Sequence, residues 1–236
     1  MGRGRLGVFV QVRLASVRLP GKACLTVGDR SVIEHVMAAL GRVEAEVHAL
    51  LSDAEGARRL GGCALGCGFE TFAGSEQDVL LRFCDAIRHY EVSHLVRATG
   101  DNPLVSPRLV RLTLEEYHRS GADLCHTMGN PLGTGVEVIR GSALLRAGEQ
   151  ARAAEEREHI STYLYRHPEL FRIHEPQAPP ECLFRNALVS VDTTEDYERV
   201  RRIFADLYAG EPIETEAVVL WLQRHPEMVR LHEISY

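Results

Sequence analysis

Near its beginning the sequence has a short segment in which three cationic side chains are spaced for holding an anion. Arg13, Arg18 and Lys22 follow an apolar run, residues 6–10, that predicts a buried strand. Small and rigid residues separate the cations, so the loop can turn backbone N–H groups inward around polyanionic oxygen. Arginine offers forked donors to phosphate, and lysine offers a compact charge. The segment lacks the Walker A glycine pattern, and a solvated basic loop fits its spacing equally well.

Two acids could supply a metal site beside such a loop. Asp101 follows an apolar stretch at residues 95–98, and Asp192 follows another at residues 187–191. Parallel strands present their carboxyl ends at one edge of a sheet, so the two carboxylates can converge although they are far apart in the chain. Mg²⁺ prefers one or two carboxylates together with phosphate oxygens and water. The local alternatives are a turn-stabilising contact at the first acid and a helix cap at the second.

The elements that would position these side chains alternate between strands and helices. The apolar patterns predict strands at residues 6–10, 43–51, 69–72, 94–98, 123–126 and 187–191. They predict helices at residues 31–40, 54–60, 75–90, 107–120, 142–156, from about 194, and at 215–226. This alternation predicts an α/β domain with a three-layer sheet and right-handed crossovers over residues 1–236. Residues 122–170 interrupt it and are expected to form a smaller lobe.

Several local signals accompany these helices. Ser31 and Glu34 have the spacing of a capping box, and Gly61 with the glycine after it is expected to end the second helix. Ser75 is expected to cap the third helix. Asp78 lies four residues before Arg82 on that helix, and taken alone this spacing predicts a surface ion pair.

Composition limits the classes of partner. Hydrophobic residues make up 45% and charged residues 25%, which is ordinary for a soluble globular protein. The formal net charge of -6 argues against nucleic acid or a membrane surface as a partner. Because no signal peptide or membrane-length apolar run is evident, we expect a cytoplasmic protein. The 6 cysteines lack convincing zinc spacing and are expected to be reduced and mostly buried.

Five strings match the motifs of one enzyme family, in order and over nearly the whole chain. The first is Gln-x-Arg-x-x-Ser-x-Arg-Leu-Pro-Gly-Lys at residues 11–22, and the others lie at residues 74–83, 99–104, 157–163 and 191–197. Together they resemble the cytidylyltransferases of the spore-coat polysaccharide biosynthesis type, relatives of the synthetases that activate Kdo and sialic acid as CMP-sugars. In the last string Thr194 replaces the family's proline, and either residue suits a helix start.

The resemblance implies a nucleotidyltransferase fold of the GT-A-like, Rossmann-like type that uses CTP and Mg²⁺ and forms a homodimer. It implies that the loop wraps the triphosphate, that Asp101 binds the metal, and that the start of the helix at residues 75–90 lies close to the nucleotide base. Asp192, which follows its own apolar stretch, is expected to complete the metal pair. The catalytic residues are then Arg13, Lys22, Asp101 and Asp192. The implied nucleotide-binding residues are Gln11, Arg13, Leu14, Ala15, Ser16, Arg18, Lys22, Ser75, Asp78, Arg97, Thr99, Gly100 and Asp101.

The acceptor side departs from the family pattern at one position. Residues 130–139 resemble a stretch that usually reads Gly-x-Asp-Val-Glu-Val and lines the acceptor pocket. Glu137 is retained, whereas Gly135 stands where relatives have aspartate, which bears on the identity of the acceptor. The implied acceptor-binding residues, in a lobe at residues 122–170 that also forms dimer contacts, are Asn130, Gly135, Glu137, His159 and Tyr163.

The sequence therefore predicts a CTP-dependent cytidylyltransferase that releases pyrophosphate and forms a CMP-activated sugar or acidic acceptor for surface polysaccharide or glycoconjugate. The alternative is a nucleotidyltransferase of the same fold that uses another NTP or a phosphorylated or phosphonate acceptor and gives an NDP-linked product. A non-catalytic nucleotide-binding module is a third class. The pair formed by Asp101 and Asp192 argues against it, because a binder needs no metal pair.

Overall fold

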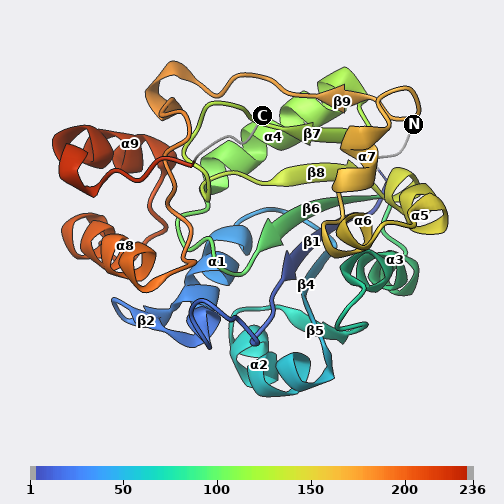
Figure 1. Cartoon of the computed structure of the whole chain (residues 1–236), viewed down its shortest axis with the longest axis horizontal. Helices are drawn as coiled ribbons and strands as arrows, with labels where there is room; N and C mark the ends of the chain where they lie inside the picture. The colour runs from blue at the N-terminus through green and yellow to red at the C-terminus, as the bar shows by residue number, and fades with distance from the viewer. Residues whose placement is uncertain (1–3, 233–236) are drawn as a thin grey trace.

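A seven-stranded sheet runs through the middle of the protein, a computed structural model of which describes residues 4–232 (Figure 1). The strands lie in the order β5-β4-β1-β6-β8-β7-β9, and β8 alone of those described runs antiparallel to its neighbours. In chain order the sheet strands are β1 (Leu6–Gln11), β4 (Val47–Ser52), β5 (Glu70–Ala73), β6 (His94–Thr99), β7 (Leu124–His126), β8 (Glu137–Arg140) and β9 (Ile173–His174). A separate hairpin pairs β2 (Thr26–Val27) with β3 (Arg30–Ser31).

Helices cover both faces of this sheet, and β1 is apolar up to its last residue, Gln11, because its middle is buried on both sides. Phe9 faces the cluster formed with α3 and α5, whereas Val8 and Val10 face α1, α2 and α4. All three side chains are fully buried. The helices are α1 (Val32–Leu40), α2 (Ala54–Gly66), α3 (Val79–Tyr90), α4 (Pro107–Ser120), α5 (Gly141–Gln150), α6 (Ala154–Glu158), α7 (Thr162–Arg166), α8 (Thr194–Leu207) and α9 (Thr215–Arg224).

A third apolar cluster lies beyond the carboxyl ends of the strands, where α8 and α9 pack together (Figure 1). Trp221 of α9 is 3% exposed in this cluster, and Ile203 of α8 is fully buried. The chain reaches α8 through a segment in which the Val191 N–H donates to the carbonyl oxygen of Asp101 at 2.8 Å. That backbone bond brings the start of α8 to the end of β6.

The predicted three-layer α/β fold is confirmed. The helix at residues 107–120 has the predicted bounds, and Ser31 with Glu34 forms the predicted capping box. The prediction that the second helix ends at Gly61 is wrong, since α2 continues to Gly66. Gly61 and the glycine after it lower only the intrinsic helix propensity of this segment. The burial of Ala64 against the core stabilises the last turns of the helix.

Three further boundaries differ from the sequence-based expectation. The helix predicted at 142–156 is broken between α5 and α6, where Ala151 is extended and buried. The Glu156 carboxylate accepts the backbone N–H groups of Arg152 and Ala153 there, at 3.3 Å each, and starts a new helix. Residues 187–191 form isolated bridges rather than a sheet strand. Asp78, not Ser75, is the N-cap of α3, and its carboxylate accepts the Leu81 N–H at 2.8 Å.

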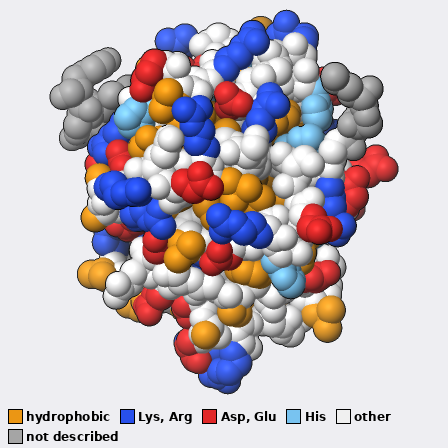
Figure 2. Space-filling view, turned by 90° about the vertical axis from the view of Figure 1, so that its right-hand side faces the viewer, with side chains coloured by type: hydrophobic (Ala, Val, Ile, Leu, Met, Phe, Trp, Pro, Cys, Tyr) orange, Lys and Arg blue, Asp and Glu red, His pale blue; other side chains and the backbone are white. Residues whose placement is uncertain are grey.

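Within residues 122–170, β7 and β8 extend the main sheet, while α5 and α6 pack beside α3. The acceptor and dimer role of this segment stays a prediction. On the side of the molecule that carries α3, α5 and α6, acidic and basic side chains are interspersed (Figure 2). Among residues 4–232 no helix is both long and apolar enough to span a bilayer. All six cysteines are free, and three are buried.

Candidate active site

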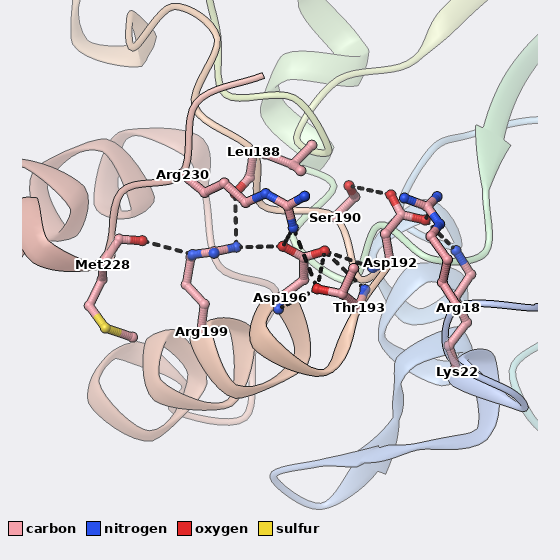
Figure 3. Close-up of polar contacts among 10 residues, drawn as sticks. All are labelled: Arg18, Lys22, Leu188, Ser190, Asp192, Thr193, Asp196, Arg199, Met228 and Arg230. Carbon is pink, nitrogen blue, oxygen red and sulfur yellow. Dashed lines mark hydrogen bonds and ion pairs between the residues drawn. The ribbon is translucent and has the colours of Figure 1, made fainter. Parts of the chain in front are cut away.

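One lysine joins the basic loop to both predicted metal-binding acids. Lys22 stands directly after Gly21, whose φ of 68° lets the chain turn back into a short 3-10 helix. Its Nζ lies 2.5 Å from Oδ2 of Asp101 and 2.8 Å from Oδ1 of Asp192. A guanidinium nitrogen of Arg18 contacts the same Asp192 oxygen at 3.0 Å (Figure 3). The two acids therefore converge as predicted, although only Asp101 follows a sheet strand.

The Lys22 ammonium is charged in this position. Burial alone would lower the pKa of Lys22, but Asp101 and Asp192 together raise it above its usual value. The ammonium lies between the two carboxylates. Among the residues described, no set of three or more His, Cys, Asp or Glu side chains could hold a metal. Two carboxylates fit Mg²⁺ when substrate phosphate oxygens and water complete its coordination.

A cavity of about 410 Å³ opens beside this cluster at the carboxyl ends of β1 and β6. The loop after β1 forms one wall, and the turn after β6 forms another. The apolar floor includes Val12, which is 5% exposed. Nine of the thirteen predicted nucleotide-binding residues line this cavity: Gln11, Arg13, Ala15, Ser16, Arg18, Lys22, Thr99, Gly100 and Asp101.

An exposed ion pair closes part of the cavity mouth. Arg13 contacts Glu158 at 2.9 Å, with side chains that are 42% and 48% exposed. The Arg13 guanidinium holds the pKa of Glu158 below its usual value. Such an exposed pair contributes little to stability, so Arg13 can exchange this carboxylate for a phosphate. His159, predicted to contact the acceptor, lies along this first cavity.

A second cavity of about 200 Å³ lies on the other side of β6. Arg97 lines it and contacts both Gln11, at 3.2 Å, and Glu137, at 3.3 Å. Through Gln11 the second cavity is linked to the first. The Tyr165 hydroxyl lies 2.8 Å from Nδ1 of His126 and 3.3 Å from Glu137, and burial followed by the Glu137 charge raises the pKa of Tyr165. Tyr165 and His126 were not predicted from the sequence.

The wall of the second cavity holds acceptor atoms without partners. Asn130 donates to Thr134 at 3.0 Å, which leaves its Oδ1 buried and unbonded among the described residues. Thr127 Oγ1 is in the same state nearby. A side chain at Gly135 would crowd the same two residues, because an added Cβ would lie 3.0 Å from Asn130 Nδ2 and 3.6 Å from Thr127 Oγ1. The glycine therefore keeps open the space that these polar atoms line.

The structure places four other predicted site residues apart from the cavity walls described above: Tyr163, Ser75, Leu14 and Asp78. Tyr163 lies in the core, 8% exposed, and donates to Gln150. Ser75 caps its own turn by accepting the Asp78 N–H at 3.0 Å. Leu14 packs against the core beneath the loop.

The surface ion pair predicted between Asp78 and Arg82 is wrong. Asp78 instead pairs with Arg157 of α6, whose Nε lies 2.8 Å from Oδ2 of Asp78. Arg82 turns inward, is 1% exposed, and lines the first cavity. Spacing on a helix could not distinguish these outcomes, because the partner comes from another helix far along the chain.

The sequence pattern of the cytidylyltransferase family matches residues 8–217. The chain belongs to the cytidylyltransferase family. The resemblance inferred from the five motifs is thereby confirmed, and the protein is a nucleotidyltransferase.

Three similar proteins illustrate the relationship. Spore coat polysaccharide biosynthesis protein SpsF of Bacillus subtilis is 28% identical over 93% of this chain and 94% of its own length. The 3-deoxy-manno-octulosonate cytidylyltransferase of Aeromonas hydrophila is 27% identical over 58% of this chain and 56% of its own length. A solved cytidylyltransferase from Leptospira borgpetersenii, 24% identical, superposes with a TM-score of 0.86 over 99% of this chain and 100% of that one.

Asp196 of this cytidylyltransferase is a supporting residue that the sequence did not single out. Its side chain is fully buried, and Oδ2 accepts the backbone N–H groups of Asp192, at 3.3 Å, and Thr193, at 3.0 Å (Figure 3). Arg199 and Arg230 each donate to Oδ1 at 2.8 Å. Burial raises the pKa of Asp196, but these bonds outweigh it and hold the pKa below its usual value. Asp196 thus positions Asp192.

Substituting Asn for Asp196 should destabilise the fold by about 3–5 kcal/mol, because it leaves the buried Arg199 guanidinium without its counter-charge. Since the folded-state pKa is depressed, this contribution is present above pH ~4 and is lost as pH falls through the lower folded-state pKa. Urea unfolding of parent and Asp196→Asn across pH 3–7 measures it.

The matched control is Glu198→Gln on the same helix, which removes an exposed partner of Arg201 and should change stability by less than about 0.5 kcal/mol. A gap between parent and Asp196→Asn that stays constant below pH ~4 would contradict the assigned charge.

Proposed function

We propose that this protein is a CTP-dependent cytidylyltransferase that forms a CMP-activated sugar or sugar acid and releases pyrophosphate, for surface polysaccharide or glycoconjugate. The observation that carries the proposal is the cluster in which Lys22 meets Asp101 and Asp192 beside a cation-lined cavity. CTP as the nucleotide is suggested by the relative named for 3-deoxy-manno-octulosonate cytidylyltransfer. We expect the enzyme to be a cytoplasmic homodimer.

The chain's own residues would bind and orient the triphosphate. Arg18 and Lys22 lie where phosphate oxygens can displace their present carboxylate contacts, and Arg13 can leave the exposed Glu158. These cations would offset the charge that builds on the leaving pyrophosphate. The acceptor hydroxyl gives its proton to water, and its oxygen forms a bond to the α-phosphorus. The bond from that phosphorus to the β-phosphate bridge breaks, and pyrophosphate leaves with the electron pair.

Asp101 and Asp192 would hold Mg²⁺ between them once the nucleotide brings phosphate oxygens to complete the coordination. The bound ion would neutralise phosphate charge. In its absence Lys22 separates the two carboxylates, which would otherwise repel each other.

The second cavity would hold the acceptor. Its buried oxygens on Thr127 and Asn130 can accept hydrogen bonds from hydroxyl groups, and Glu137 is a further acceptor. Arg97 is the cation available to a carboxylate. This mixture suits a polyhydroxylated acid better than a phosphate ester, which would need more positive charge. A phosphorylated acceptor that gives an NDP-linked product is therefore the second candidate.

The nucleotide assignment is tested by measuring pyrophosphate release from CTP, UTP, ATP and GTP with Mg²⁺ and a panel of sugar acids, neutral sugars and sugar phosphates. We expect turnover with CTP and a sugar acid to exceed the others by at least about tenfold, the difference that 1.4 kcal/mol of binding produces. Turnover confined to a sugar phosphate and another NTP would replace the proposal by the second candidate.

The metal assignment is tested by Asp101→Asn and Asp192→Asn. Each should lower pyrophosphate release on the order of 100-fold or more at any Mg²⁺ concentration, if its effect resembles the loss of one oxyanion donor. Melting temperatures should stay close to that of the parent, because Lys22 keeps one carboxylate partner in either variant. Asp85→Asn, an exposed change on α3, is the control. Full activity with an unaltered Mg²⁺ requirement would remove that residue from the site.

The acceptor assignment is tested by Glu137→Gln. Glu137 meets Arg97 and Tyr165 in the second cavity, so its charge should matter for the acceptor and not for the nucleotide. We expect the KM for the acceptor to rise about tenfold while CTP affinity, measured by calorimetry, is unchanged. Lost CTP binding in a folded variant would show that the two cavities are assigned wrongly.

A further inference from the structure

The first cavity contains a buried cation that has no counter-charge in contact. Arg82 is 1% exposed, and among the described residues its Nε and Nη1 have no hydrogen-bond partner. Within residues 4–232 its guanidinium makes no ion pair, unlike Arg157 on the neighbouring helix. Burial, and then the nearby Arg13, lowers the pKa of Arg82. A buried charge without a partner destabilises the fold, so we expect a ligand to bind to this side chain.

The backbone is shaped to hold Arg82 in this position. Arg82 lies on α3, and its stem packs on Gly74 directly after β5. A Cβ added at Gly74 would lie 2.7 Å from Cγ of Arg82, so only glycine leaves room for the stem. The guanidinium is therefore held at the β5 side of the cavity that it lines. The phosphate-binding cations and the two acids lie at the β1 and β6 side.

We propose that Arg82 recognises the cytosine base of the nucleotide through two N–H donors, and so selects CTP over UTP. This inference rests on the proposed function and names the residue that sets its base preference. A nucleotide whose phosphates lie at Lys22 and Arg18 extends its base toward the opposite side of the cavity, where Arg82 is.

The donor pattern of a guanidinium matches cytosine and opposes uracil. Either edge of the Arg82 group offers two adjacent N–H donors and no acceptor. Cytosine presents two adjacent acceptors, O2 and N3, which can accept hydrogen bonds from both of these donors. Uracil carries a hydrogen on N3, so one donor would face another donor and a buried N–H would be left without a partner.

A phosphate is a poorer match at this point. After the nearby Arg13, the carboxylates of Asp53 and Glu76 also act on Arg82. They offset part of the positive charge that would attract a polyphosphate, whereas a neutral base is not repelled by them. The exposed Arg13 and Arg18 are better placed to meet phosphates, since they can move without losing buried contacts.

The test is the dissociation constant of CTP and of UTP, each with Mg²⁺ and no acceptor, for parent, Arg82→Met and Arg82→Lys. The ratio of the UTP constant to the CTP constant should fall about tenfold to a hundredfold in Arg82→Met, as expected for the loss of a bidentate base contact. Arg82→Lys keeps the charge but loses the two adjacent N–H donors of the guanidinium. The ratio should therefore fall by most of the same factor in this variant. The melting temperature of ligand-free Arg82→Met should not fall, because an unpaired buried charge is removed.

Arg88→Met is the matched control, since Arg88 lies on the same helix and pairs with Asp85 at the surface. It should leave both constants unchanged.

An equal loss of CTP and UTP binding in Arg82→Met would identify a phosphate contact and overturn base recognition. An unchanged ratio in folded Arg82→Lys would overturn it as well. If the parent itself does not prefer CTP, the nucleotide assigned in the proposed function is wrong, and the role of Arg82 is wrong as well. A parent preference that survives in both Arg82 variants overturns only this inference.

Discussion

The contact on which the site depends is the Lys22 ammonium held between Asp101 and Asp192. It joins three segments that are far apart in the chain: the loop after β1, the turn after β6 and the start of α8. Two carboxylates brought this close would repel each other, and the lysine offsets that repulsion. The same geometry suits the proposed function, in which the two carboxylates would hold a divalent cation and Lys22 would bind a phosphate.

The arrangement of the two cavities follows from the strand order. The first cavity spans the carboxyl ends of β1 and β6, with Arg82 toward β5, and the second spans β6, β8 and β7. Because β8 runs antiparallel, its first residue, Glu137, lies at the same sheet edge as the last residues of β6 and β7. Arg97 of β6 contacts both Gln11 and Glu137, so it stands between the first cavity and the second. Reacting groups bound in the two cavities would meet near Asp101.

Support for the acids comes from outside the sheet. Asp196 is fully buried and accepts the backbone N–H of Asp192, while Arg199 and Arg230 neutralise it. The apolar cluster around α8 and α9 buries this network at the carboxyl edge. A small shift of α8 would therefore move Asp192 relative to Lys22. The C-terminal helices act on the site by position, without lining either cavity.

The sequence alone determined the layered α/β fold, the basic loop and the two acids that converge on it, because their signals are local. Buried strands appear as short apolar runs, helix starts carry caps, and Arg13, Arg18 and Lys22 lie within ten residues of one another. Asp101 and Asp192 could be selected because each follows an apolar stretch, although residues 187–191 proved to be held by isolated bridges. The departure at Gly135 was also visible in the sequence.

Only the tertiary structure decided which partners distant side chains find. Helical spacing predicted an ion pair for Arg82, yet Asp78 pairs with Arg157 from another helix and leaves Arg82 buried in the cavity. Tyr163 was predicted at the acceptor site, but it packs in the core, whereas Tyr165 lies at the wall of the second cavity. The two side chains differ because positions two residues apart on a short helix face different directions. Charge and hydrogen-bonding capacity are written in the sequence, whereas burial and partners depend on contacts between residues far apart in the chain.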